Sequence, residues 1–352
     1  MTNVVEKPVA ETDSAFLAAD VGGTFARVAL VRESRGGAQP VQVLQYTKYR
    51  CSEYPSLGVI LREFATAHGL RARRCALACA GFLLDDNVIN TSLPWNLSVS
   101  ATRAEAGLDE VALVNDFTAV AHAADQVPAS EMILLAGASM QHRGGPSLVV
   151  GPGTGLGAAV RIPYGGECIV LSTEAGQSAF APNTPREMDI LRVLSRGNSH
   201  VPVEMVVSGP GLVNIYRALC ELDGHGPMLD EPSAISDAAM AGSDPVAREA
   251  LDVFCGAIGS LVGNLVLLYG AQGGVYLAGG VLPRISGFLR TSSFVERLLD
   301  KGPMREMLEQ VPVRLIDHGQ LGVVGAAVWY LQRQRASSRA QDSAAPLARA
   351  AK

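Results

Sequence analysis

Two glycine-rich segments carry the residue types that a phosphate-binding site needs. One is Asp20–Thr24 (DVGGT) and the other is Gly151–Gly157 (GPGTGLG), and each follows an apolar run. A chain that reverses through glycines exposes consecutive backbone N–H groups, and such concavities bind anions, phosphates among them. Threonine hydroxyls add donors, and Asp20 can hold a magnesium ion directly or through water. The alternative interpretation is a pair of β-hairpin turns in which glycine only supplies positive φ.

Other nucleotide-binding and catalytic motifs are excluded because an essential residue is missing. A Walker A loop needs Gly-Lys-Ser/Thr, but the chain has four lysines, none in that setting: Lys7, Lys48, Lys301 and Lys352. The chain also lacks the strand lysine and the His-Arg-Asp sequence that protein kinases need. The dinucleotide fingerprint would need glycine at Leu156 and a helix where a strand is predicted. The motifs Gly-x-Ser-x-Gly and His-Glu-x-x-His do not occur either.

The apolar runs around the two glycine segments predict alternating strands and helices. The predicted strands are 15–19, 26–31, 75–80, 111–114, 147–150, 158–162 and 274–278. The predicted helices are 54–68, 117–124, 186–195, 211–222 and 245–270, with a last one from about Gly322. A strand–glycine turn–strand unit therefore opens two similar blocks. This pattern is typical of a duplicated α/β domain with a cleft between the copies.

Length and composition agree with that fold class. A chain of 352 residues suits two α/β domains, and 48% hydrophobic with 18% charged residues is typical of a folded protein. The formal net charge of −5, from 29 basic and 34 acidic residues, argues against nucleic-acid binding through phosphates. The one basic cluster, Arg71, Arg73 and Arg74, is interpreted as a solvated helix end.

Nothing in the sequence indicates export or membrane insertion. The six cysteines form no C-x-x-C pair and are expected to be reduced thiols in or near the core. The N-terminus lacks the apolar stretch of a signal peptide. The longest apolar run, Phe254–Tyr269, is interrupted by glycines and Asn264 and is predicted to be a buried helix. We therefore expect a cytoplasmic protein with no membrane partner.

Six sequence blocks occur in a recognisable order: DVGGTFARVAL, VNDFTAV, GPGTGLGAAV, EAGQSAFAPN, VSGPGLVNIYRAL and YLAGGVLPR. Together they resemble the bacterial glucokinases, from about Phe16 to Leu331. The resemblance implies two actin-like, ribonuclease H-like α/β domains flanking a substrate cleft. It also implies ATP-dependent transfer of phosphate to a hexose, most directly D-glucose to glucose 6-phosphate, with ATP and Mg²⁺. The zinc-binding cysteine cluster of the related repressor–kinase group is missing, which favours the glucokinase branch.

The resemblance assigns roles on the nucleotide side. The ATP phosphates are expected to lie against Ala19, Asp20, Val21, Gly22, Gly23 and Thr24, with Asp20 near the metal. The second phosphate loop would be Gly153, Thr154 and Gly155, and the adenosine would lie against Gly279 and Gly280.

The resemblance also assigns the sugar side. Asn115 and Asp116 would hold the sugar hydroxyls, with Glu174, Gln177 and Glu204 completing the site. Asp116 would be the general base, because a free aspartate with a pKa of about 3.9 is ionised at pH 7. Each assignment has an alternative. Asn115 or Asp116 can be a helix N-cap, Glu204 a partly buried carboxylate paired with an arginine, and Glu174 a loop charge.

Two residues depart from the family pattern. Gln177 stands where the family usually has histidine, and Ser92 stands where asparagine is common. An amide replaces the hydrogen bond of a histidine with a different reach and no titration near neutral pH. We therefore expect weakened or altered hexose affinity. Two alternatives stay open: a kinase for another hexose, and a weakly active sugar-sensing regulatory protein on the same fold.

The expected domain organisation follows from these elements. Residues 1–13 are expected to be a disordered tail, and residues 14–126 a small α/β domain completed by a C-terminal helix at 320–335. Residues 127–319 would form the large α/β domain, and residues 337–352 a second disordered tail rich in Ala, Ser and Arg. The resemblance alone implies a homodimer.

Overall fold

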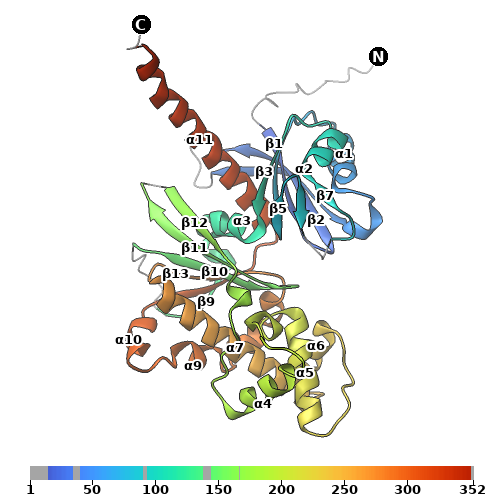
Figure 1. Ribbon diagram of the computed structural model, residues 1–352, viewed down its shortest axis with the longest axis vertical. Helices are drawn as coiled ribbons and strands as arrows, with labels where there is room; N and C mark the ends of the chain where they lie inside the picture. The colour runs from blue at the N-terminus through green and yellow to red at the C-terminus, as the bar shows by residue number, and fades with distance from the viewer. Residues whose placement is uncertain (1–14, 35–39, 90–92, 138–143, 166, 350–352) are drawn as a thin grey trace, which may run out of the picture. The chain divides into compact units, whose positions relative to one another are not determined.

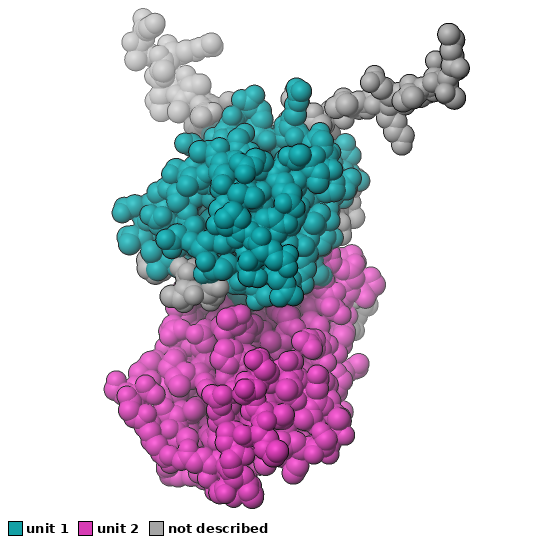
Figure 2. All heavy atoms as spheres, turned by 90° about the vertical axis from the view of Figure 1, so that its right-hand side faces the viewer, with its two compact units in different colours: residues 1–126, 319–352 teal, residues 127–318 magenta. Residues whose placement is uncertain are grey.

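The computed structural model describes residues 15–34, 40–89, 93–137, 144–165 and 167–349. The chain divides into two compact units, coloured separately in Figure 2. Unit 1 comprises residues 1–126 and 319–352, and unit 2 comprises residues 127–318. The expected N-terminal tail, 1–13, lies outside the described residues, as does Ser92.

The described residues of unit 1 form two sheets and four α-helices, and these elements are drawn in Figure 1. The larger sheet has the order β3-β2-β1-β4-β8, from β1 (Ala15–Val21), β2 (Phe25–Glu33), β3 (Val41–Arg50), β4 (Arg74–Cys79) and β8 (Glu110–Asn115). The smaller sheet consists of β5 (Phe82–Leu84), β6 (Asn87–Ile89) and β7 (Leu97–Ser98). The helices are α1 (Leu57–Ala67), α2 (Val99–Ala106), α3 (Asp116–Ala123) and α11 (Leu321–Arg349), and the 3₁₀ helices are Cys51–Glu53 and Ala124–Gln126.

The alternation of side chains along β1 explains the layers of unit 1. Successive residues of a strand point to opposite faces of the sheet. Leu17 belongs to a core that also holds Ile60 and Phe64 of α1. Phe16 belongs to a second core with residues of α3 and α11, among them Tyr330. Unit 1 is therefore a sheet covered by helices on both faces (Figure 1).

Unit 2 contains a six-stranded sheet of order β12-β11-β10-β13-β14-β9. Its strands are β9 (Met132–Ala136), β10 (Ser147–Pro152), β11 (Leu156–Tyr164), β12 (Glu167–Thr173), β13 (Gly274–Leu277) and β14 (Val313–Ile316). Its α-helices are α4 (Pro185–Leu194), α5 (Gly209–Leu222), α6 (Pro232–Ala241), α7 (Pro245–Tyr269), α8 (Ser286–Leu289), α9 (Phe294–Leu299) and α10 (Arg305–Leu308). Its 3₁₀ helices are Ala129–Glu131, Ala175–Gln177, Val203–Met205, Leu282–Ile285 and Gly302–Met304.

The two units repeat one strand arrangement. In unit 1, β1 pairs antiparallel with β2 and parallel with β4. In unit 2, β10 pairs antiparallel with β11 and parallel with β13. In both units a glycine turn joins the two antiparallel strands, β1 to β2 and β10 to β11. The predicted α/β fold is confirmed, and the strand–glycine turn–strand motif is repeated, although in unit 2 it follows β9 and does not open the unit.

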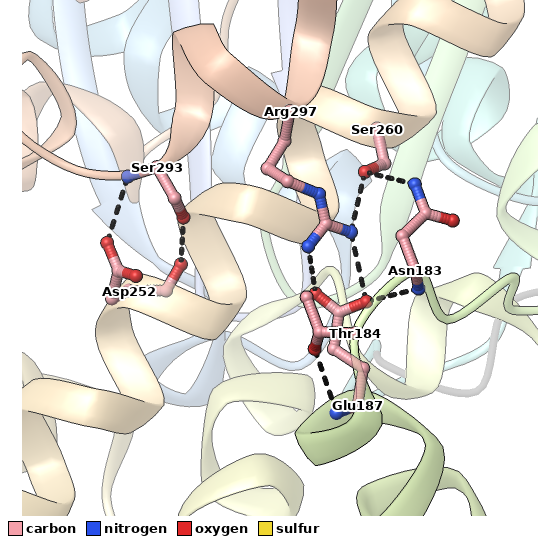
Figure 3. A network of polar contacts seen from close by, with 7 residues as sticks. All are labelled: Asn183, Thr184, Glu187, Asp252, Ser260, Ser293 and Arg297. Atoms are coloured by element: carbon pink, nitrogen blue, oxygen red, sulfur yellow. Dashed lines mark hydrogen bonds and ion pairs between the residues drawn. The ribbon is translucent and has the colours of Figure 1, made fainter. Parts of the chain in front are cut away.

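A buried ion pair lies in the helical layer of unit 2 (Figure 3). The side chains of Glu187 and Arg297 are 3% and 10% exposed, and their oxygen and nitrogen atoms approach to 2.9 Å. Arg297 Nη2 also donates to Ser260 Oγ at 3.0 Å, and Glu187 Oε2 accepts from the backbone N–H of Asn183 at 2.7 Å. These bonds join the start of α4 to α7 and α9. Because both charges are desolvated, the loss of one leaves the other uncompensated.

Helix α7 is the expected buried helix. By length and composition it alone, among the described helices, could cross a membrane, but 72% of its most apolar window is buried within the protein. Its residues Phe254, Ile258 and Val262 belong to the core that also contains Leu148 of β10. The apolar run therefore serves the core of unit 2.

Helix α11 differs from the expectation of a disordered tail from residue 337. The helix continues to Arg349. Alanine and arginine are strong helix formers, and five alanines fall between residues 336 and 348. The hydroxyls of Ser337 and Ser338 donate to backbone carbonyls one turn earlier, and Arg335 pairs with Glu33. The Ala-rich composition thus extends the helix.

Candidate active site

The first glycine segment forms the turn between β1 and β2. The N–H of Gly22 donates to the carbonyl oxygen of Phe25 at 3.0 Å, which closes the turn. The carbonyl of Thr24 accepts a bond of 2.9 Å from the N–H of Cys51, which directly follows β3. The side chain of Thr24 is exposed. This turn therefore has a braced backbone and an accessible hydroxyl. We call it the phosphate hairpin (Asp20–Phe25), after the role that the sequence predicts for it.

Asp20 lies at the base of the phosphate hairpin. Its side chain is 19% exposed, and Arg27 Nη1 lies 3.1 Å from Oδ2. A Cβ added to Gly322 would lie 2.5 Å from Asp20 Cγ, so the first turn of α11 approaches this carboxylate closely. Burial raises the pKa of Asp20, and the charge and hydrogen bond of Arg27 only partly offset this effect.

The surroundings of Asp20 bear on the expected magnesium. No group of three or more His, Cys, Asp or Glu side chains suited to a metal occurs among the described residues. Mg²⁺ typically keeps several waters and binds one or two carboxylates together with substrate phosphates. A single carboxylate beside a glycine turn fits an ion that arrives with the nucleotide. It does not fit a permanently bound metal.

Asn115 and Asp116 lie where β8 passes into α3. Asn115 is the N-cap of α3, since its Oδ1 accepts a bond of 3.1 Å from the N–H of Thr118. The capping alternative is therefore confirmed for Asn115, and it uses only the amide oxygen, so the amide nitrogen can still donate to a ligand. Asp116 is the first residue of α3 and is partly exposed. Its Oδ1 accepts from the N–H of Phe117 at 2.9 Å.

The second glycine segment forms the turn between β10 and β11 in unit 2. The N–H of Gly153 donates to the carbonyl of Gly155 at 2.7 Å, and the carbonyl of Gly153 accepts from the N–H of Gly209 at 2.8 Å. Gly209 is the first residue of α5. Thr154 is exposed at the tip of this turn. The start of a helix thus braces the second glycine turn (Gly151–Gly157).

Gly279 packs against the same turn. Its φ is +97°, a region that favours glycine, and an added Cβ would lie 2.8 Å from the carbonyl oxygen of Pro152. Gly279 and Gly280 follow β13 and are both exposed. The glycine requirement at position 279 therefore comes from close contact with the second glycine turn.

Glu204 connects the second glycine turn to the predicted sugar residues of unit 2. Its Oε2 accepts from the N–H of Leu156 at 2.7 Å, and its Oε1 accepts from Gln177 Nε2 at 3.3 Å. A Cβ added to Gly155 would lie 2.6 Å from Oε2, so a larger residue there would displace this carboxylate. No ion pair between Glu204 and an arginine occurs in the described part of the chain. The arginine-paired alternative for Glu204 is therefore wrong.

Glu174 and Gln177 flank a short 3₁₀ helix (Ala175–Gln177). The N–H of Gln177 donates to the carbonyl of Glu174 at 2.9 Å, and both side chains are exposed. The carbonyl of Gln177 also bonds to His200 Nε2 at 2.9 Å. The buried Gly176 lies against Leu156, because an added Cβ would be 2.8 Å from the Leu156 carbonyl oxygen. Unit 2 thus brings Glu174, Gln177 and Glu204 together beside its glycine turn.

Comparison with known proteins identifies the family. The family model for glucokinase matches residues 17–333. The chain belongs to the glucokinase family. A glucokinase-like protein from Xylella fastidiosa (strain 9a5c) is 51% identical over 320 residues, which cover 91% of this chain and 95% of that protein. A glucokinase from Saccharophagus degradans is 40% identical over 315 residues, covering 89% and 97%.

Solved structures give the same assignment. The crystal structure of a glucokinase from an Antarctic psychrotroph aligns with a TM-score of 0.78 and 32% identity, covering 90% of this chain and 98% of that one. The predicted glucokinase resemblance and two-domain actin-like fold are confirmed. Membership of the glucokinase family carries ATP-dependent phosphorylation of a hexose with it.

Sequence reasoning missed several residues of this candidate site. Arg27 lies inside a recognised block, and its partner Asp20 is its cross-strand neighbour in the hairpin, so the pair could have been found. Gly209 also lies in a recognised block, at a Ser-Gly-Pro-Gly helix start. Cys51 and His200 have no local signal, because each contacts the site through residues distant in the sequence.

Proposed function

We propose that this chain phosphorylates D-glucose at its primary hydroxyl, with MgATP as the donor and Asp116 as the general base. The observation that carries the proposal is the double contact of Glu204. One carboxylate bonds both to the backbone of a glycine turn and to the amide of Gln177. The second glycine turn, which we propose binds phosphate, and the loop of Gln177, which we propose binds the sugar, are thereby connected within unit 2. Transfer of a phosphoryl group between two substrates requires that both are held in fixed positions.

Phosphoryl transfer depends on positioning and on stabilisation of charge more than on covalent chemistry. In the proposed reaction the phosphate hairpin and the second glycine turn hold the triphosphate through backbone N–H groups and through Thr24 and Thr154. Asp20 would hold the Mg²⁺ that accompanies ATP, and this ion would neutralise charge on the phosphates. The sugar oxygen attacks the γ-phosphorus, the bond to the β-phosphate oxygen breaks, and ADP leaves.

The proton of the attacking hydroxyl passes to Asp116. The position of this residue supports the role: it opens α3, is partly exposed, and follows a capping asparagine whose amide nitrogen can donate to a sugar hydroxyl. Its Oδ1 accepts the Phe117 N–H, which fixes the carboxylate relative to the helix. Glu174, Gln177 and Glu204 bind the remaining hydroxyls in the proposal.

Asp116→Asn tests the assignment of the base. General-base catalysis contributes roughly 10²–10⁴ in rate, so kcat should fall by that range while MgATP binding is retained. Asp109→Asn is a matched control, because Asp109 is an exposed aspartate of the same unit paired with Arg73. A purified Asp116→Asn protein that phosphorylated glucose at the parental rate would refute the role of Asp116.

The identity of the sugar is tested separately. Gln177 stands where the family usually has histidine, and its amide is engaged by Glu204. ADP release should be measured with glucose, mannose, fructose and glucosamine at fixed MgATP. A higher kcat/KM for glucose than for the other three supports the proposal. A higher kcat/KM for another of these sugars would make that sugar the substrate in place of glucose. Binding of a sugar without ADP release would favour the regulatory alternative. We place the reaction in the cytoplasm, at the entry of glucose into glycolysis.

A further inference from the structure

Cys51 holds the phosphate hairpin through two contacts. It directly follows β3 and its side chain is fully buried. Its thiol donates to the carbonyl oxygen of Gly22 at 3.4 Å, within the usual range for sulfur, and its backbone N–H donates to the carbonyl oxygen of Thr24 at 2.9 Å. One residue therefore fixes two carbonyl groups on the same turn.

The orientation of these carbonyls sets the direction of the N–H groups. In a trans peptide the C=O and the N–H point in opposite directions, and every described peptide bond is trans. Because the Gly22 carbonyl is turned toward Cys51, the N–H of Gly23 in the same peptide is turned away from it. Among the described residues none accepts a hydrogen bond from this N–H. The Gly23 N–H is therefore a hydrogen-bond donor that points away from Cys51.

We propose that Cys51 is a positioning residue for nucleotide binding: its thiol and backbone N–H hold the hairpin carbonyls so that the Gly23 N–H donates to a phosphate oxygen of ATP. The inference rests on the proposed function, because it assumes that the phosphate hairpin binds ATP. It adds a residue outside the glycine segments and gives it a defined role. That role needs the protonated thiol, since only S–H can donate.

The surroundings keep the Cys51 thiol in that form. Burial raises the pKa of Cys51, and a backbone hydrogen bond and the positive charge of Arg27 only partly oppose this. The thiol is therefore protonated at neutral pH and is not a reactive thiolate.

Trp95 offers a spectroscopic report on Cys51. The indole Nε1–H of Trp95 donates to the carbonyl oxygen of Cys51 at 3.2 Å. The chain has two tryptophans, and the other, Trp329, lies in α11. In a Trp329→Phe background the emission of Trp95 alone therefore follows changes at Cys51. Binding of a phosphate to the phosphate hairpin should alter this emission.

The test uses the full-length Trp329→Phe protein as parent. MgATP is titrated while the emission of Trp95 is recorded, and KM values for MgATP and glucose are measured separately. Cys51→Ala should raise both the Kd and the KM for MgATP about three- to tenfold, as expected for one lost hydrogen bond. Its KM for glucose should stay within about twofold. Cys51→Ser, which retains a donor, should restore part of the affinity.

Cys75→Ala is the matched control. Cys75 is equally buried and belongs to the same core cluster as Cys51, but it lies in β4 away from the turn. Parental MgATP affinity in Cys51→Ala would overturn the inference while leaving the proposed function intact. An equal loss in Cys75→Ala, or no recovery in Cys51→Ser, would also overturn it, because core packing would then explain the effect. A parent that neither binds MgATP nor forms ADP with any sugar would remove both proposals.

Discussion

Replacement of Glu204 tests whether one carboxylate supports both substrates. In Glu204→Ala the N–H of Leu156 loses its 2.7 Å acceptor, and the amide of Gln177 loses its 3.3 Å partner. Leu156 is buried, so its N–H has restricted access to water. Both the second glycine turn and the 3₁₀ helix that carries Gln177 should become less ordered.

The magnitude follows from the two bonds. A hydrogen bond to a charged group contributes about 1.5–3 kcal/mol, and a buried donor left unpaired costs about 1–3 kcal/mol. The longer contact with Gln177 adds little. A loss of about 2 kcal/mol corresponds to a decrease of about 30-fold in kcat/KM. In Glu204→Gln the amide oxygen can still accept from Leu156 and the new NH₂ can face Gln177 after that amide rotates, so the loss should be about fivefold.

Initial rates over a grid of MgATP and glucose concentrations measure the effect. The bridging role predicts that KM rises for both substrates in Glu204→Ala and less in Glu204→Gln. Glu221→Ala serves as the control, because Glu221 is an exposed glutamate of unit 2 paired with Arg196, and surface changes are usually within about 0.5 kcal/mol. A rise in the glucose KM alone, with the MgATP KM unchanged, would refute the bridge and leave Glu204 as a sugar ligand only.

Three further predictions follow from the structure. Burial raises the pKa of Asp20 in the folded protein, so the ionised carboxylate opposes folding. The stabilising contribution of the protonated carboxyl is complete below its unfolded pKa of about 3.9. This contribution is lost as the pH rises through the folded pKa. Asp20→Asn should therefore have a Tm at pH 7 no lower than the parent, a difference that shrinks toward pH 4, together with lost kinase activity; a clearly lower Tm at pH 7 would contradict this. Gln177→His should lower the glucose KM and introduce a pH dependence of that KM near pH 6.5, whereas an unchanged KM would show that Gln177 does not limit sugar binding. Arg297→Met should lower the free energy of urea unfolding by about 3–5 kcal/mol, because Glu187 is left buried without its partner. The control Arg305→Ala breaks an exposed ion pair and should lower the same free energy by less than about 1 kcal/mol. Equal effects of the two changes would argue against a stabilising role of the buried pair.

Much of the fold could be predicted because its signals are local. A continuous apolar run in β1 and in β10, followed by glycines, is enough to indicate a strand that reverses. The predicted helix at 54–68 begins at Leu57 because Ser56 caps it, its hydroxyl accepting from the N–H of Val59 at 3.2 Å. Such capping is a property of neighbouring residues and can be read from sequence.

The contacts that shape the site could not be predicted, because they join distant segments. Glu204 accepts a hydrogen bond from the N–H of Leu156, 48 residues away in the sequence, and Cys51 donates to Gly22, 29 residues away. The approach of Gly322 to Asp20 joins opposite ends of the chain. The fold alone brings these pairs together. The helix beyond residue 337 was missed because a composition rich in Ala, Ser and Arg suits both a disordered segment and a helix.

The dependence of unit 1 on α11 has a consequence for the order in which the protein is made. A ribosome releases residues 127–318 before the segment that covers Phe16 and Ala18 with Val323 and Tyr330. Domains generally fold as they emerge, at about 5–20 residues per second. Unit 2 can therefore mature while the N-terminal sheet still exposes an apolar face. A released chain that ends at His318 would contain all of unit 2, but its N-terminal sheet would lack the residues that cover Phe16 and Ala18, and it would expose an apolar surface of the kind that chaperones recognise.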